Sequence, residues 1–184
     1  YMVPLAIATA TSVLVAQSLG AAQPAQARAR AWAGIRIALA CAAAIGAALF
    51  VAREPLAALY TTDSTLVAAA APLLALVAAF HLFDAAQAMC SFILRAYRIT
   101  ALPMLVYVLS LWGVGLGGGW WLAFGIGTSA RPWAPLVAGA RGFWTASGLS
   151  LALAAAGLAA ILARLWRRAE DDQLRGAIDR NPSR

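Results

Sequence analysis

The chain contains five long apolar runs, and this pattern constrains its fold more than any other feature. Crossing the hydrocarbon core of a bilayer takes about 20 predominantly apolar residues in a helix, because every backbone amide must be paired within the segment. We therefore predict an all-α membrane protein with about five transmembrane helices. The predicted helices span residues 1–19, 30–52, 64–93, 101–125 and 142–166. Asp63 and Ser64 precede the third helix and are suitable residues to cap its first turn.

The composition favours a membrane protein over a water-soluble one. Of the 184 residues, 63% are hydrophobic and 11% are charged, whereas a soluble domain has roughly 25% charged residues. The 14 basic residues are all arginine, and they gather in short clusters between the apolar runs. We therefore expect the net charge of +7 to meet anionic membrane lipids, and we expect no nucleic acid as a partner.

The distribution of arginine predicts how the helices are oriented, because cytoplasmic loops carry an excess of basic residues. Seven Arg side chains flank one end of the predicted helices, and three flank the other, namely Arg53, Arg131 and Arg141. The seven are Arg28 and Arg30 in the first loop, Arg95 and Arg98 in the third loop, and Arg164, Arg167 and Arg168 at the end of the fifth helix. We therefore expect the N-terminus of the chain outside the cell and its C-terminus in the cytoplasm.

The two ends of the chain differ in character. Tyr1 lies in an apolar run that lacks the basic region of a secretory signal, so we expect at least one further segment upstream. Residues 1–168 form the predicted transmembrane region. Residues 169–184 mix acidic and basic side chains with too few apolar ones to pack, so we expect a charged cytoplasmic tail that is solvated or frayed.

One of the seven acidic residues stands apart from the others. Asp84 lies in the middle of the third predicted helix, whereas the other six lie in loops or in the tail. An ionised carboxylate at membrane depth is costly, so such residues usually face a bundle interior or a water-filled cavity and mark an ion or proton path. Burial favours the protonated carboxyl and an approaching cation favours the ionised one, so Asp84 is our candidate for cation or proton binding.

Asp84 belongs to a polar stripe along the third predicted helix. At about 100° per residue, the stripe falls within roughly a 120° arc and comprises His81, Asp84, Gln87 and Ser91. His81 is the only histidine. It can relay a proton of Asp84, or it can simply form a hydrogen bond to a neighbouring helix. Gln87 can bind a substrate or an ion, and interhelical hydrogen bonding explains it equally well.

Other types of functional site are not indicated by the sequence. Cys41 and Cys90 lie in separate apolar runs without His or Cys at metal-ligand spacing, so we expect neither a disulfide nor a zinc site. The sequence has no set of Ser, His and Asp in a nucleophile pattern and no phosphate-binding loop. We therefore predict that the chain is not an enzyme and holds no metal.

Three segments carry a family pattern. They are residues 4–28 (PLAIATATSVLVAQSLGAAQPAQAR), residues 84–98 (DAAQAMCSFILRAYR) and residues 139–165 (GARGFWTASGLSLALAAAGLAAILARL). They resemble segments of the multidrug and toxic compound extrusion (MATE) family, in its NorM-like branch. The first resembles the second helix of a six-helix half with the cytoplasmic loop that follows it. The second resembles the tenth helix with its exit loop, and the third resembles the last helix.

The resemblance implies helices eight to twelve of a twelve-helix transporter, so that residues 1–168 form part of its C-terminal lobe. It also implies an inner-membrane antiporter that exports cationic small-molecule drugs in exchange for Na⁺ or H⁺, with no other cofactor. The N-terminal lobe of the same transporter is then a missing partner. Asp84 matches the acidic residue of the tenth helix that takes part in cation binding. Phe80 replaces a tyrosine that some relatives have near the ion site, so we count it with His81 and Gln87 as a possible substrate or relay residue.

Two other functions remain open at this point. The first is a lipid-linked sugar or lipid flippase of the same superfamily, for which we expect a more basic central cavity. The second is a non-transporting membrane assembly subunit, in which Asp84 pairs with an Arg of a partner protein. Drug susceptibility on expression distinguishes the exporter from the flippase, and a substitution of Asp84 distinguishes a defect in transport from a defect in assembly.

Overall fold

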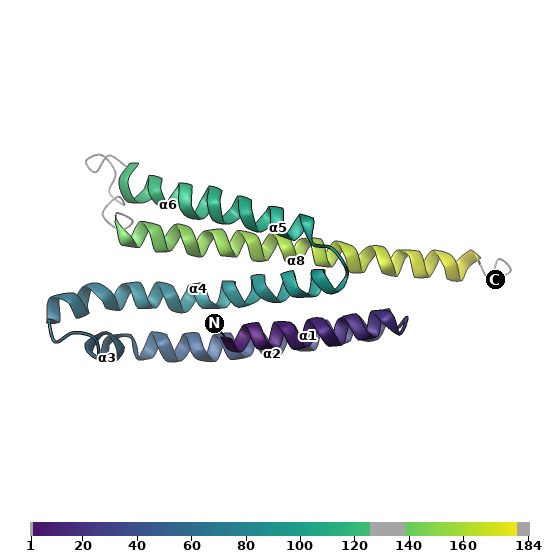
Figure 1. Cartoon of the computed structure of the whole chain (residues 1–184), viewed down its shortest axis with the longest axis horizontal. Helices are drawn as coiled ribbons and strands as arrows, with labels where there is room; N and C mark the ends of the chain where they lie inside the picture. Colours follow the sequence, from purple (N-terminus) through teal and green to yellow (C-terminus); the bar gives the residue numbers. More distant parts are fainter. Residues whose placement is uncertain (1, 126–138, 180–184) are drawn as a thin grey trace.

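A computed structural model describes residues 2–125 and 139–179, and every element in these two ranges is helical (Figure 1). The long helices are α1 (Met2–Gly20), α2 (Pro24–Val51), α4 (Ser64–Ala96) and α8 (Ala140–Asp179). A short helix, α3 (Arg53–Ala58), follows α2. A further helical rod comprises α5 (Ala101–Val108), the π-helical segments η1 (Leu109–Gly117) and η2 (Trp121–Gly125), and α6 (Gly118–Trp120) between them. Tyr1, Arg131 and residues 180–184, which entered the sequence-based predictions, lie outside the described residues.

Five helical segments in the described part of the chain are long and apolar enough to cross a membrane. They are Met2–Gly20, Pro24–Val51, Ser64–Ala96, Ala101–Phe124 and Ala140–Ala169. The predicted all-α membrane fold is therefore confirmed. Hydrophobic length decides this outcome, because a continuous helix is the simplest way to pair every backbone amide inside the bilayer.

Two helix ends differ from the sequence-based boundaries by more than three residues. α2 begins at Pro24 rather than at residue 30, because proline is favoured at the first helical position, where its missing N–H costs nothing. Arg28 and Arg30, which we expected in a loop, therefore lie in the first turns of α2, and the connection to α1 shrinks to residues 21–23. At the other end of the chain, the backbone of α8 continues as a helix to Asp179 rather than ending near residue 166.

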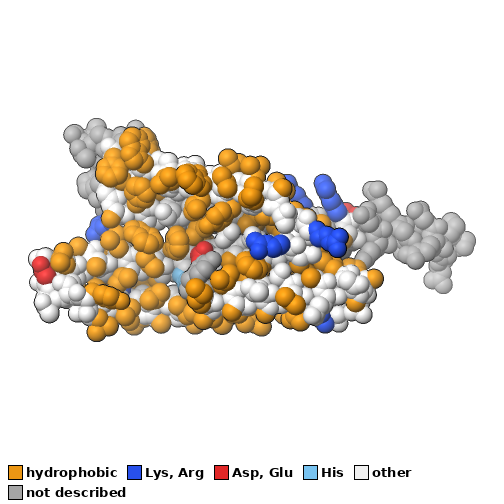
Figure 2. Space-filling model, viewed as in Figure 1, with side chains coloured by type: hydrophobic (Ala, Val, Ile, Leu, Met, Phe, Trp, Pro, Cys, Tyr) orange, Lys and Arg blue, Asp and Glu red, His pale blue; other side chains and the backbone are white. Residues whose placement is uncertain are grey.

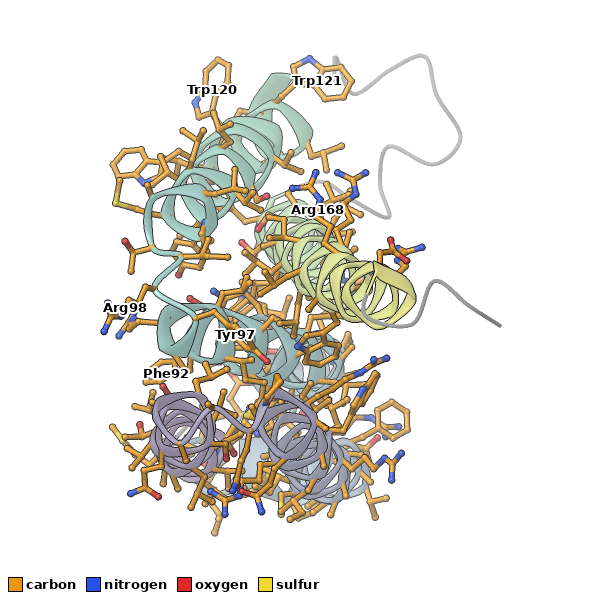
Figure 3. The ribbon with its side chains drawn as sticks, turned by 90° about the vertical axis from the view of Figure 1, so that its right-hand side faces the viewer. Phe92, Tyr97, Arg98, Trp120, Trp121 and Arg168 are labelled. Atoms are coloured by element: carbon orange, nitrogen blue, oxygen red, sulfur yellow. The ribbon has the colours of Figure 1, made fainter. Side chains whose placement is uncertain are left out.

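α4 occupies the centre of the bundle. It packs against α1 and α2 on one side and against α8 on the other, while the α5–α6 rod packs against α8 (Figure 1). The main core is a single cluster to which all four long helices contribute, with Ala8, Ala27, Met89 and Leu158 fully buried. Trp120 and Trp121 of the outer rod point away from the other helices and are exposed, so they face the surroundings of the bundle (Figure 3).

Small residues bring two helix pairs into close contact. A Cβ atom at Gly34 of α2 would overlap the side chain of Thr11 of α1, lying 2.9 Å from the Thr11 Cβ. A Cβ at Gly46 would lie 3.0 Å from the backbone oxygen of Ala78 in α4. Such close approach is how membrane helices gain packing contacts where no water drives them together.

Asp63 caps α4 as the sequence predicts. Its Oδ1 accepts a hydrogen bond of 2.8 Å from the backbone N–H of Thr65 and one of 2.6 Å from the Thr65 hydroxyl. The hydroxyl and then the amide hold the pKa of the Asp63 carboxyl below its ordinary value of 3.8. These bonds satisfy a free amide of the first turn.

The arginines are distributed unequally between the two ends of the bundle. One end contains the α1–α2 connection, the α4–α5 connection and the C-terminal part of α8, and Figure 2 shows arginine side chains gathered toward it. We call this the Arg-rich end, and its arginines are Arg28, Arg30, Arg95, Arg98, Arg164, Arg167 and Arg168. Arg53 and Arg141 belong to the opposite end.

Candidate functional site

Asp84 lies half-buried on α4 and lines a cleft of about 310 Å³ between α4 and α5. Gln87 and Ser91, also on α4, line the same cleft. The remaining lining residues are Ala88, Phe92 and Arg95 of α4, Ile99 and Thr100 of the connection, and Pro103, Met104 and Tyr107 of α5. The structure thus brings three of the four residues of the predicted polar stripe into one cavity.

Helix geometry explains this alignment. Positions 84, 87, 91 and 95 are separated by three or four residues, so their side chains fall on one face of α4. Asp84 and Arg95 stand at opposite ends of this row, about 16 Å apart along the helix axis at about 1.5 Å per residue. The cleft therefore holds a negative group near the middle of α4 and a positive group at the Arg-rich end, too far apart to pair directly.

His81 lies on α4 one turn before Asp84 but does not line the cleft. Its side chain is 9% exposed, and its Nε2 atom has no hydrogen-bond partner among the described residues. Among the side chains that the structure describes, the hydrogen bonds found do not include one to the carboxylate of Asp84.

Phe80 packs against a side chain of α8. Its ring meets the ring of Trp144 of α8 edge-on, with centroids 5.7 Å apart and planes at 81°. It does not line the cleft of Asp84. The structure therefore places Phe80 in the contact between α4 and α8, whereas Asp84 of the same helix faces α5.

Sequence reasoning missed several residues of the cleft. Arg95 was assigned only to the charge bias of the loops, although extending the polar stripe by one more turn reaches it. Tyr107, Met104 and Pro103 carried no signal, because the face that α5 turns toward α4 is decided by its packing against α8. Lining residues from a second helix are therefore visible only once the helices are assembled.

The chemistry of the cleft suits a cation. Asp84 offers a carboxylate, Gln87 an amide oxygen, and Ser91, Thr100 and Tyr107 offer hydroxyl oxygens. Phe92 adds an aromatic ring, and the guanidinium carbon of Arg95 lies over it, 4.8 Å from the ring centroid, which is the geometry by which such a ring attracts a cation. The described residues contain no cluster of three or more His, Cys, Asp or Glu side chains that could hold a metal ion.

The chain is similar to known membrane transporters in sequence and in structure. The model of the MatE family matches residues 1–121. The probable multidrug resistance protein NorM of Aromatoleum aromaticum is 40% identical over 173 residues, which cover 94% of this chain and 36% of that protein. The multidrug resistance protein PmpM of Pseudomonas aeruginosa is 33% identical over 91% of this chain and 34% of its own length.

The fold agrees with these matches. The crystal structure of the eukaryotic MATE transporter AtDTX14 superposes on 89% of this chain and 34% of its own, with a TM-score of 0.75 at 24% identity. The chain spans about a third of the length of the relatives it matches. Because the family model covers more than half of the sequence and the helices share the fold of a MATE transporter, the chain belongs to the MatE family.

Proposed function

We propose that this chain is the C-terminal part of a multidrug efflux antiporter in the bacterial inner membrane, corresponding to helices eight to twelve. The names of its relatives, multidrug resistance proteins, support efflux of drugs as the activity of the whole protein. The span of about a third of their length supports a partner lobe from the same polypeptide. Since Arg-rich loops stay on the cytoplasmic side, the Arg-rich end faces the cytoplasm and the N-terminus of α1 lies on the outer side.

The observation that carries the proposal is the position of Asp84, which lies near the middle of α4 and opens into a cleft. A carboxylate at this depth is stabilised by a cation, whether Na⁺, H⁺ or a positively charged drug. The same carboxylate cannot serve the driving ion and the drug well at once. This mutual exclusion couples the entry of the ion to the release of the drug, because each displaces the other from Asp84.

Three neighbours of Asp84 have supporting roles in this proposal. Gln87 supplies an amide oxygen beside the carboxylate and contacts the ion or the drug. His81 lies one turn before Asp84 on the same helix and relays its proton when H⁺ is the driving ion. Phe80 acts from outside the cleft, where its contact with Trp144 holds the middle of α4 against α8.

The test is the Asp84→Asn substitution in the complete transporter, with efflux of a cationic dye as the measurement. Asparagine keeps the shape of the side chain and removes its charge, so we expect cation-driven efflux to be lost at an unchanged protein level. Asp63→Asn is the matched control on the same helix, because Asp63 is exposed and asparagine also caps helices well. Wild-type efflux with unchanged ion dependence in Asp84→Asn would contradict the proposal.

The names of the relatives favour an exporter over the flippase that the sequence left open. The cleft also contains one Arg and one Asp rather than a basic lining. An assembly subunit makes a different prediction for Asp84→Asn, namely a change in the size of the complex on gel filtration. The exporter requires instead that this variant keep its size and lose transport.

A further inference from the structure

Arg95 places a positive charge of the protein itself in the cleft that contains Asp84. It belongs to the last turn of α4 and lines the cleft at the Arg-rich end. Its guanidinium carbon lies 4.8 Å from the centroid of the Phe92 ring, which lines the same cleft one turn earlier. Asp84 and Arg95 are the two charged side chains among the lining residues that the structure describes. The aromatic wall of the cleft therefore already holds a cation.

The cleft offers a bound cation two different positions. Asp84 provides a carboxylate, with the amide oxygen of Gln87 in the same lining. The ring of Phe92 provides an aromatic face, which is a surface on which proteins bind quaternary ammonium groups. Asp84 and Phe92 are separated by about 12 Å along the helix axis at about 1.5 Å per residue. One compact cation therefore cannot fill both positions, whereas a long molecule with a positive group at each end can.

The contact between Arg95 and Phe92 is weak enough to be exchanged. Arg95 is exposed and Phe92 is half-buried, and a cation gains less from a solvated ring than from a desolvated one. The long side chain of Arg95 also loses rotamer freedom when it is fixed on the ring. An arriving cation must nevertheless displace the guanidinium and remain close to its charge. Arg95 therefore opposes the binding of a second positive group at Phe92.

The effect of Arg95 is confined to its own end of the cleft. Arg95 lies about 16 Å from Asp84 along the helix axis, and salt largely screens an exposed charge beyond about 8 Å. A small ion or a singly charged drug at Asp84 is therefore little affected by Arg95. A second positive group on the same drug, two turns further along α4, meets Arg95 directly.

We propose that Arg95 is a specificity-determining residue that restricts the cleft to organic monocations. Its guanidinium acts as a tethered second cation on Phe92, so a dication is denied the contact that its second charge would make. This inference rests on the function proposed above, because Asp84 is taken as the site of the first charge. Replacing Arg95 by a neutral residue opens the position on Phe92 to elongated dications.

The test measures binding to the purified complete transporter in detergent, as displacement of ethidium followed by fluorescence anisotropy. Two competitors are compared. Decyltrimethylammonium has one quaternary ammonium group, and decamethonium has a second one at the other end of the same alkyl chain. In Arg95→Gln we expect decamethonium to bind about two- to fivefold more tightly, the contribution of one cation–π contact at an exposed ring. The affinity for decyltrimethylammonium should change by less than about twofold, because the charge of Arg95 is screened from Asp84.

Arg98→Gln is the matched control, because Arg98 belongs to the same end of the bundle but points away from the helices and does not line the cleft (Figure 3). Arg95→Lys keeps the positive charge, so we expect it to keep the weak binding of decamethonium. Adding Phe92→Leu to Arg95→Gln removes the ring, and the gain for decamethonium should disappear. Thermal melting shows whether each variant is folded. If the double variant does not fold, the comparison of the two competitors in Arg95→Gln decides.

An unchanged affinity for decamethonium in Arg95→Gln, or an equal gain for both competitors, would overturn the inference and leave the role of Asp84 intact. A gain in Arg98→Gln as large as that in Arg95→Gln, or a gain that persists without the ring of Phe92, would do the same. The Asp84→Asn variant separates the inference from the proposed function. Ethidium binding as tight in Asp84→Asn as in the wild type would overturn both.

Discussion

The indole Nε1 of Trp166 and the hydroxyl oxygen of Tyr97 are joined by a hydrogen bond of 3.1 Å, which ties α8 to the residue that ends α4. Tyr97→Phe removes the acceptor and leaves the N–H of a buried tryptophan unpaired. An unsatisfied buried donor costs about 1–3 kcal/mol, so we expect the free energy of unfolding to fall by that amount. Titration with a denaturing detergent measures this change. Tyr60→Phe, at a tyrosine that is 91% exposed, should leave the stability unchanged.

The contact between α1 and α2 predicts that a larger side chain at position 34 destabilises the protein. Gly34→Ala places a methyl group inside the volume of the Thr11 side chain, and overpacking of this kind costs roughly 1–3 kcal/mol. Adding Thr11→Ala to the same protein should restore most of the lost stability. Gly148→Ala is the control, because no atom lies within 4 Å of its added Cβ. Equal stability of Gly34→Ala and Gly148→Ala would show that the two helices are not in contact at this point.

The cap of α4 predicts a dependence of stability on pH. The pKa of Asp63 is lowered in the folded chain, so its ionised form stabilises α4 at pH values above the unfolded pKa. This contribution is lost as the pH falls through the lower folded pKa. Thr65→Val removes the hydroxyl that donates to the carboxylate, and we expect it to shift the pKa of Asp63 back toward 3.8. Carboxyl NMR titration measures the shift, and an unchanged titration curve would contradict the cap.

The edge-to-face contact of Phe80 and Trp144 predicts an energetic coupling between α4 and α8. In a double-mutant cycle of Phe80→Leu and Trp144→Leu, we expect a coupling of about 0.5–1.5 kcal/mol beyond the sum of the single effects. Phe83→Leu in place of Phe80→Leu provides the control, because Phe83 is an exposed phenylalanine on the same helix. Strict additivity of the Phe80 and Trp144 substitutions would mean that the two rings contribute through burial alone.

The fold was largely predictable because a bilayer leaves few choices for the backbone. A run of about 20 apolar residues must become a helix there, whatever its neighbours do, so length and composition were sufficient to locate all five spans. The boundaries of the helices were less predictable, as the positions of Arg28 and Arg30 inside α2 show. A charged side chain does not stop a helix, since Arg extends its long stem and keeps its head at the membrane surface while the backbone continues.

The candidate site was only half predictable, for a physical reason. Asp84, Gln87 and Ser91 share one helix, and helical periodicity alone aligns them. The contribution of α5, including Tyr107, depends on how two helices are rotated about their axes, and no local pattern records that rotation. The same limit applies to Phe80, which the resemblance to the family singled out, because its contact with Trp144 of α8 also depends on how two helices are packed.

The shared core of α1, α2, α4 and α8 has a consequence for the synthesis of the chain. Ala8 and Ala27 lie in consecutive helices that can pair as a hairpin as soon as α2 leaves the ribosome, but Leu158 belongs to α8, which is made after α4. Until α8 arrives, Met89 lacks one of its neighbours. A nascent chain that stalls before Ala140 therefore holds an open hydrophobic seam along α4, and such a product is a substrate for membrane quality control rather than a smaller working unit.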